Sequence, residues 1–417
     1  MRQATGLTST YSSDEFGICS ALYELGGMVV MHDASGCNST YTTHDEPRWY
    51  DMDSMIYISA ISETEAILGD DDKLIDDLIE TAQELHPKFI ALVGAPIPYM
   101  IGTDLEAIVQ IVSRRTGIPG FAFAANGMHD YTVGVSMALE QIVRAYADRG
   151  TDETIVKSYT DLKSDGCIIN IIGATPLDFS LNGSVASIQR WIGNHDMKNG
   201  ICLSMGCSLE DVQMAGKAQV NLVVSAVGLA AAKVLRERFG TPYVVGTPFG
   251  EMFSESLADM VRNAAVSSEN CIAYQMTEFH GKRMPGRNGM MQRAGTDTKK
   301  HLVIIGESVY CASLAAAIEM EYGIKVHVLC PLDTGSELLR PEDTYAPEED
   351  DLMRLLETCD GVIADPLYRP LVHDGQEFYP LPHEAFSGRM YDSVNPNLIA
   401  VKLTMPDRPG ESYPFVV

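Results

Sequence analysis

Short apolar runs rich in β-branched residues alternate along this chain with segments that have the apolar spacing of amphipathic helices. Met28–Met31 (MVVM), Lys88–Val93 (KFIALV) and Lys325–Cys330 (KVHVLC) are three of these short runs. The segment that follows Asp72 carries a stripe of apolar residues: Leu74, Ile75, Leu78, Ile79, Ala82 and Leu85. Strands that alternate with helices in this way pair in parallel, because each helix carries the chain back across the sheet. The pattern therefore predicts an α/β fold built of parallel sheets.

The alternation stops and restarts twice, which indicates three domains. A polar segment at 150–166 (GTDETIVKSYTDLKSDG) precedes a second series of strands and helices that opens with CIINIIG at 167–173. A segment rich in Gly, Pro and Arg at 282–298 precedes a third series that opens with HLVIIG at 301–306. At roughly 100–200 residues per domain, the 417 residues allow two to four domains. We predict an N-terminal arm with a first α/β domain at 1–160, a second domain at 161–295 and a third at 296–417.

The charge balance and the cysteine content narrow the class of protein further. Acidic residues outnumber basic ones by 57 to 30, and such an excess of negative charge repels nucleic acid, which is therefore not an expected partner. The 9 cysteines are odd in number and lack C-x-x-C spacing, which argues against a disulfide framework. The longest apolar stretches fall short of the ~20 residues of a membrane helix, so we expect no membrane contact. The polar N-terminus lacks the pattern of a secretory signal, and we expect a cytoplasmic protein.

Cys37 is the cysteine whose surroundings are most informative. It closes the segment HDASGC at 32–37, in which small residues and Gly36 follow a predicted strand. A thiol in this position lies at the carboxyl edge of a parallel sheet, where α/β proteins bind their ligands, and a glycine lets backbone amides approach the sulfur or a bound cluster. By spacing alone, a buried free cysteine is the simpler interpretation.

An ordered set of short motifs resembles the nitrogenase component 1 family. That family includes the catalytic subunits of nitrogenase, the scaffold on which its cofactor is assembled, and the dark-operative reductases of the chlorophyllide pathway. The family's H-G-x-x-G-C appears as HDASGC at 32–37, and its S-E-x-x-x-x-x-G and I-G-D-D-[IL] appear at 62–69 and 101–105. Further matches lie at 127–138, 217–222 and 380–391. The resemblance covers nearly the whole chain and implies three Rossmann-like parallel-sheet domains of the nitrogenase component 1 type.

The resemblance also implies a metal site. In the family, the cysteine of H-G-x-x-G-C binds an iron–sulfur cluster at the interface of two related subunits, so Cys37 becomes a ligand candidate. Two further family ligands have no cysteine here: the upstream position holds Tyr11 and Ser12, with Cys19 nearby, and the position before I-G-D-D holds Pro96. We expect a 4Fe–4S cluster shared between subunits, because such a cluster needs four thiolates or substitute oxygen or nitrogen ligands. Either a partner chain contributes ligands, or a symmetric dimer pools Cys37 and Cys19 from both copies.

Four other residues are candidates for binding a cofactor or substrate. In the family, the metallocofactor is bound by a cysteine and a histidine. Their positions correspond here to Ser225 and approximately to His383. Serine is a poor ligand for soft metals, so a structural role for Ser225 is the favoured interpretation, and His383 either caps a helix or is exposed. Arg283 and Arg287, in the basic segment with Lys282 and Arg293, either neutralise an anionic cluster or substrate carboxylate or form an inter-domain salt-bridge loop.

These expectations combine into one function and two alternatives. As the resemblance implies, the chain would be an oxidoreductase component, in a homodimer or with a related second subunit. An ATP-hydrolysing iron protein would deliver electrons to its cluster for a low-potential reduction in the cleft between the domains. The first alternative is a non-catalytic scaffold or carrier for metallocluster assembly. The second is a small-molecule binder that keeps the fold without a cluster.

Overall fold

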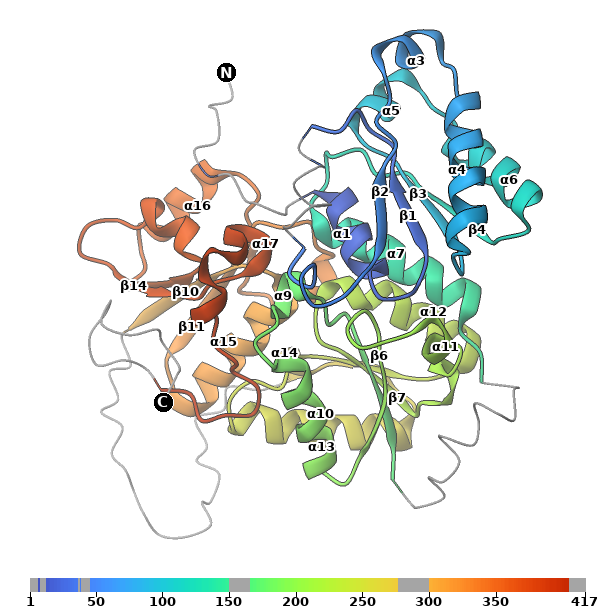
Figure 1. Ribbon diagram of the computed structural model, residues 1–417. Coiled ribbons are helices and arrows are strands. Elements are labelled where there is room, and N and C mark those ends of the chain that lie inside the picture. Colours follow the sequence, from blue (N-terminus) through green and yellow to red (C-terminus); the bar gives the residue numbers. More distant parts are fainter. Residues whose placement is uncertain are drawn as a thin grey trace.

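The computed structural model describes residues 7, 13–36, 38, 46–149, 166–276 and 300–404, without the side chains at 392 and 393. Its strands form three separate sheets, each built of parallel pairs and each flanked by helices (Figure 1). The expected α/β class with three parallel-sheet domains is therefore confirmed. The predicted boundaries near 160 and 296 both fall outside the described residues and stay predictions.

The first sheet has the strand order β2-β1-β3-β4. Its strands are β1 (Met28–Met31), β2 (Met55–Ile58), β3 (Ile90–Val93) and β4 (Gly120–Phe123). Its helices are α1 (Asp14–Leu22), α3 (Glu63–Leu68), α4 (Asp72–Leu85), α5 (Pro96–Ile101), α6 (Leu105–Thr116) and α7 (Tyr131–Tyr146). Alternate residues of β1 face opposite sides of the sheet. Val29 is therefore part of the hydrophobic core that includes α1 and α7, and Val30 is part of a second core that includes α4 and α6.

The second sheet has the order β6-β5-β7-β8-β9. Its strands are β5 (Ile168–Ile172), β6 (Lys198–Cys202), β7 (Val220–Val223), β8 (Tyr243–Val245) and β9 (Cys271–Ile272). Its helices are α9 (Pro176–Phe179), α10 (Ser184–Asn194), α11 (Leu209–Val212), α12 (Leu229–Phe239), α13 (Met252–Ser267) and α14 (Ala273–Met276), with short 3-10 turns η2 (Ala215–Lys217) and η3 (Ala226–Gly228).

The third sheet has the order β12-β11-β10-β13-β14. Its strands are β10 (His301–Ile305), β11 (Lys325–Cys330), β12 (Thr344–Tyr345), β13 (Gly361–Ala364) and β14 (Glu377–Pro380). Its helices are α15 (Ser308–Tyr322), α16 (Glu349–Leu356) and α17 (Glu384–Ser387), with 3-10 turns η4 (Ser336–Leu338), η5 (Pro366–Leu371) and η6 (Gly388–Val394). In the part of the chain that the structure describes, no helix has the length and apolar character needed to cross a membrane.

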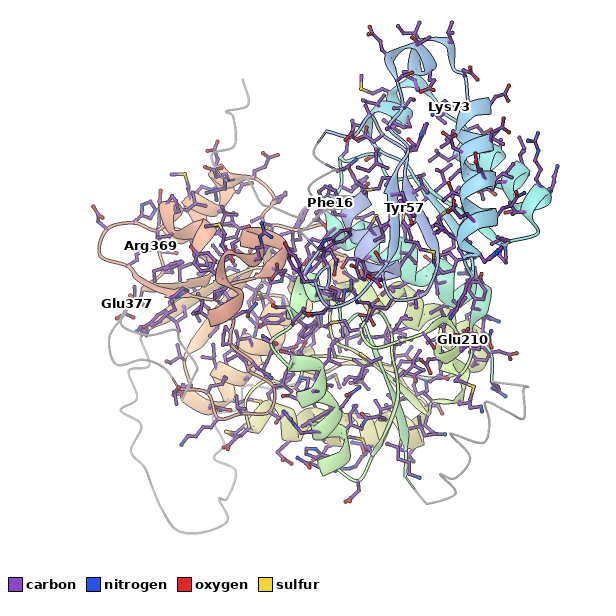
Figure 2. All side chains as sticks on the ribbon, viewed as in Figure 1. Phe16, Tyr57, Lys73, Glu210, Arg369 and Glu377 are labelled. Atoms are coloured by element: carbon purple, nitrogen blue, oxygen red, sulfur yellow. The ribbon has the colours of Figure 1, made fainter. Side chains whose placement is uncertain are left out.

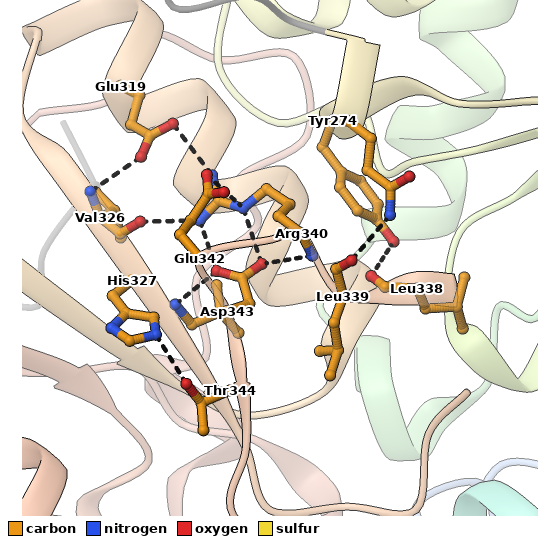
Figure 3. Close-up of polar contacts among 12 residues, drawn as sticks. Tyr274, Glu319, Val326, His327, Leu338, Leu339, Arg340, Glu342, Asp343 and Thr344 are labelled. Atoms are coloured by element: carbon orange, nitrogen blue, oxygen red, sulfur yellow. Dashed lines mark hydrogen bonds and ion pairs between the residues drawn. The ribbon is translucent and has the colours of Figure 1, made fainter. Parts of the chain in front are cut away.

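Buried polar side chains hold the domains to one another. Arg48 donates to the Glu24 carboxylate at 2.9 Å and to the backbone oxygen of Ser204 in the second domain at 3.0 Å. Tyr274 donates from the second domain to the backbone oxygen of Leu338 in the third at 2.8 Å, beside the ion pair of Arg340 with Asp343 (Figure 3). These contacts join the second domain to both of the others.

The first domain reaches outward from the place where the three domains meet. Figure 2 shows Phe16 of α1 near this meeting place and Lys73 of α4 close to the far tip. One hydrophobic cluster includes buried residues of all three domains, such as Val29, Ile169 and Ile304. The junction between the domains is thus a continuation of the core, and polar groups inside it are desolvated.

Candidate functional site

The carboxyl edge of the first sheet carries the HDASGC segment. Cys37 itself lies outside the described residues, but the turn on either side of it is defined. Ser35 and Gly36 have φ angles of 95° and 49°, in the left-handed region that suits glycine and turns the chain sharply. Asn38 donates to Oδ2 of Asp33 at 2.7 Å, so the residues before and after position 37 close a compact loop.

His32 directly follows β1 and is almost fully buried. Its Nδ1 lies 2.8 Å from the hydroxyl oxygen of Ser59, whereas its Nε2 has no hydrogen-bond partner among the described residues. Burial lowers the pKa of the imidazole to about 4. The ring is therefore neutral near pH 7.

Asp14 and Glu15 form the first turn of α1, and their carboxyl groups have different surroundings. Asp14 accepts the backbone N–H groups of Asn126 at 3.1 Å and Gly127 at 2.9 Å. Glu15 is only 5% exposed, and its Oε2 finds no hydrogen-bond partner within the described part of the chain. The pKa of Glu15 is raised to about 8, chiefly by burial and in part by the hydrogen bond and charge of the neighbouring Asp14 carboxyl group.

Glu15 lies close to Pro96, which stands where the family resemblance leads one to expect a thiol. A Cβ atom built on Gly127 would lie 2.8 Å from Pro96 Cγ and 3.6 Å from Glu15 Oε1. Gly127 has a φ of 70°, so both its backbone conformation and the close approach of Pro96 favour glycine there. The structure thus brings the start of α1, the start of α5 and the turn after β4 together at the sheet edge.

Cys19 lies one turn further along α1. Its side chain is fully buried in the hydrophobic core, and burial raises the pKa of the thiol well above its usual value, with a smaller contribution from the Glu15 charge. Its assignment as an iron ligand stays a prediction.

The structure brings Ser225 and His383 together at the three-domain junction, on either side of Asp178. Ser225 follows β7 and donates to Asp178 Oδ2 at 2.6 Å. Tyr131 of α7 donates to Asp178 Oδ1 at 2.5 Å. His383 Nε2 lies 3.4 Å from the same Oδ1, in a geometry that is an ion-pair contact but no hydrogen bond. The Asp178 carboxylate is therefore shared by side chains from all three domains.

His383 occupies the N-cap position of α17, although its ring makes no cap hydrogen bond. It is 8% exposed, so the expectation of an exposed side chain is wrong. Asp365 fixes the backbone at this point, because its Oδ2 accepts the N–H of His383 at 2.8 Å and the hydroxyl of Ser387 at 2.7 Å. The ring lies against aromatic neighbours, with centroid distances of 6.2 Å to Tyr310 and 4.9 Å to Phe386.

Glu307 adds a second buried carboxyl group to the junction. It accepts backbone N–H groups from Ala226 of the second domain at 3.1 Å and from Tyr310 at 2.7 Å. The pKa of Glu307 is raised to about 7, chiefly by burial and in part by the charge of Asp178. The turn IGES at 305–308 is thus a strand-to-helix connection whose acidic side chain caps α15 and reaches across the domain boundary.

Sequence reasoning missed Tyr131 and Asp178 as members of this cluster. A usable indication was present, since polar residues come shortly after β5, β7 and β10, at Asp178, Ser225 and Glu307. Carboxyl ends of parallel strands gather ligand-binding and polar groups. Arg283 and Arg287 lie outside the described residues, so their roles stay predictions.

An open groove of about 490 Å³ lies between the three domains on one side of this junction. It is lined by α7, by η3 and α12, and by the segment 333–338. Ion pairs border it, His129 with Asp333 at 3.2 Å and Lys233 with Glu337 at 3.1 Å. The groove reaches the junction at Ala226, which belongs to its lining and whose backbone N–H donates to Glu307.

The fold and the junction together place this chain among proteins built of three parallel-sheet α/β domains that meet at a buried polar site. The family model of the nitrogenase component 1 type oxidoreductases matches residues 20–355. The chain therefore belongs to the nitrogenase component 1 type oxidoreductase family.

Individual proteins that are similar to this chain in sequence or in fold are consistent with its membership of this family. A light-independent protochlorophyllide reductase subunit from Cycas taitungensis is 28% identical over 285 residues, which cover 65% of this chain and 54% of the relative. Its counterpart from Nostoc punctiforme is 25% identical over 278 residues, covering 64% and 54%. The chain spans about half the length of the curated relatives it matches. A solved structure described as nitrogenase Cp1 at pH 5 has the same fold, with a TM-score of 0.61 at 15% identity over 92% of this chain and 85% of that one.

Proposed function

We propose that this chain is an electron-accepting subunit of a nitrogenase-like reductase and that it holds an iron–sulfur cluster through Cys37. The observation that carries the proposal is the polar lining of the first sheet's carboxyl edge around the HDASGC segment. Glu15 and His32 are both buried there, and each has a polar atom without a hydrogen-bond partner among the described residues. Buried polar atoms are normally paired, so an edge of this kind fits a bound inorganic group better than a closed core.

The proposed assembly is a homodimer or a pair of related subunits, with the cluster at their contact. One chain offers Cys37 and Cys19, and two copies would supply the four thiolates that a 4Fe–4S cluster needs. An ATP-dependent iron protein is the proposed electron donor, as the resemblance to the family implies, and the relatives named as reductase subunits agree with a reductive role. When bound, the cluster supplies one-electron transfer at low potential. Arg283 and Arg287 are proposed to offset negative charge of the cluster or substrate, and the cytoplasm is the proposed location.

The alternative, a scaffold or carrier for metallocluster assembly, is favoured by one observation at the three-domain junction. Ser225 stands where the family resemblance puts a cofactor anchor, and its hydroxyl is already engaged by Asp178 at 2.6 Å. Tyr131 binds the other oxygen of the same carboxylate. With its hydroxyl engaged in this way, Ser225 offers no anchor for a second metallocofactor, and a subunit without one would serve assembly or electron transfer rather than substrate reduction.

The test is anaerobic purification of the full-length chain in its native assembly, with analysis of iron and acid-labile sulfide. Cys37→Ala should abolish the visible thiolate-to-iron absorbance. Cys311→Ala is the matched control, since Cys311 is a buried thiol in α15 of the third domain, and it should leave iron and spectrum intact. Wild-type iron and spectrum in Cys37→Ala would reject the cluster and favour the cluster-free binder.

The same preparation tests the assembly. Cys37 is expected within a few ångströms of the subunit contact, so solution scattering should give the mass of a dimer or larger complex. A stable monomer that still carries a full complement of cluster iron would contradict the shared site.

A further inference from the structure

We propose that a pocket at the amino edge of the second sheet binds a small phosphorylated molecule through Arg149 and Lys217. The pocket has a volume of about 570 Å³ and lies where β5, β7 and β8 begin, since Ile168, Gln219 and Pro242 belong to its lining. A cavity of this size is typical of sites for small organic ligands. The inference goes beyond the proposed function and does not depend on an iron–sulfur cluster.

The first argument is the charge of the pocket. Arg149 and Lys217 are the charged residues of its lining within the described part of the chain, and both are basic. This is unexpected in a chain with 57 acidic and 30 basic residues, in which exposed lysines such as Lys88 and Lys233 pair with carboxylates. Charges more than roughly 8 Å away are largely screened at physiological ionic strength. The local cations, rather than the net charge of the chain, therefore decide which ligand the pocket attracts.

The second argument is that these two cations have no counter-charge among the described residues. Arg149 donates one hydrogen bond, to the backbone oxygen of Phe239 at 3.1 Å, and its remaining N–H groups bind no carboxylate. The half-buried Lys217 side chain forms no hydrogen bond or ion pair with a described group. Guanidinium and ammonium groups are the side chains that proteins use most to bind phosphate oxygens. The pocket thus offers unused donors that suit an anionic phosphate group.

Two further arginines add positive charge beside the pocket. Arg236 and Arg238, in the last turn of α12, donate to the backbone oxygens of Gly240 and Val143 rather than to carboxylates. The negative end of the helix dipole accounts for cations at this position. It does not account for Lys217, which belongs to η2 of the same domain and is not part of α12.

The third argument is that backbone contacts hold the two cations close together across the boundary between the first and second domains. The N–H of Gly216 donates to the backbone oxygen of Asp148 at 2.9 Å. Arg149 and Lys217 directly follow these two residues in the chain. A Cβ atom at position 216 would lie 2.7 Å from the same Asp148 oxygen, so this close approach requires glycine. The two charges are brought together before any ligand binds, which lowers the cost of binding.

The experiment measures the binding of inorganic pyrophosphate to the full-length chain by isothermal titration calorimetry at low ionic strength. Lys217→Gln and Arg149→Gln each remove one charge and keep a polar side chain, and we expect each to weaken binding at least fivefold. Lys325→Gln is the matched control and should bind as wild type does. Lys325 is likewise a lysine at the amino edge of a sheet, but it is exposed at the start of β11 in the third domain.

Three results would overturn the assignment. The first is wild-type affinity in both Lys217→Gln and Arg149→Gln. The second is equal weakening in Lys325→Gln, which would mean that pyrophosphate responds only to overall charge. The third is no measurable binding to wild type at millimolar pyrophosphate.

Two further measurements keep the test decisive. Circular dichroism melting identifies a variant that fails to fold, and if Lys217→Gln does not fold, the exposed Arg149→Gln decides the question by itself. Bound iron and sulfide, measured on the same samples, should stay at the wild-type level in both variants. Failure of this site and failure of the proposed cluster are therefore distinguishable.

Discussion

Tyr131 in the first domain donates its phenolic hydrogen to Oδ1 of Asp178 in the second domain, across 2.5 Å. Both residues are buried, and the Asp178 carboxylate also accepts from Ser225 and lies 3.4 Å from His383 of the third domain. One carboxylate therefore connects the three domains at their junction. Because the site is desolvated, each of these hydrogen bonds is stronger than at the surface, and losing a donor is correspondingly costly.

Removing the Tyr131 hydroxyl should destabilise the protein. Tyr131→Phe leaves Oδ1 of Asp178 without its donor in a buried site, and we expect the free energy of unfolding to fall by about 1–3 kcal/mol. Urea denaturation followed by fluorescence measures the change. Tyr57→Phe, at a 39% exposed position on β2, is the control and should change stability by less than about 0.5 kcal/mol. Equal stability of the two variants would show that the Tyr131 contact is not a stabilising one.

Loss of the Arg48 guanidinium should be more severe. Arg48 is paired with Glu24 and Glu46, whose side chains are 8% and 0% exposed, so Arg48→Met leaves two desolvated carboxylates without that cation. We expect a loss of about 3–5 kcal/mol in the free energy of unfolding. Arg354→Met, which removes a side chain that is 72% exposed and paired with Asp351, provides the comparison and should be close to wild type. Matching melting temperatures for the two variants would contradict the role assigned to Arg48.

Acid should destabilise the protein partly through His32. Burial lowers its pKa in the folded state from 6.5 to about 4, so between these values the unfolded chain binds a proton that the folded chain does not. The contribution of His32 is therefore present above pH 6.5 and is lost as the pH falls toward 4. Between pH 7.5 and pH 5, wild type should lose about 2 kcal/mol more stability than His32→Gln. Parallel pH profiles for the two proteins would show that His32 is not responsible.

Ser225 should act as a structural residue. Ser225→Ala removes the donor to Asp178 Oδ2 and should lower the free energy of unfolding by about 1–3 kcal/mol. Iron and sulfide content, measured on the anaerobically purified chain, should stay at the wild-type level. A fall in bound metal without a fall in stability would instead indicate that Ser225 anchors a second metal group.

Local patterns in the sequence were enough to predict much of the fold. The apolar stripe of α4 agrees with its burial, since Leu74, Ile75 and Leu78 are buried in the core of the first domain. The strand expected at 88–93 is present as Ile90–Val93, shorter by two residues at its start. The Ser62 and Glu65 side chains of the S-E motif form a capping box at the start of α3, a purely local arrangement. Such features depend on residues a few positions apart, which is why a sequence specifies them.

The candidate site was predicted less completely, because it depends on how separate elements pack. Tyr131, Asp178, Ser225 and His383 come from four elements spread over the three domains, and no periodicity relates their positions. The proximity of Glu15 to Pro96 likewise arises because both approach the turn at Gly127 from separate elements. The sequence by itself determined the alternation of strands and helices, the parallel sheets and the division into three units, since hydrophobic periodicity is local. Only the tertiary structure decided which polar side chains share a buried environment, because burial and partner choice are set by the docking of whole domains.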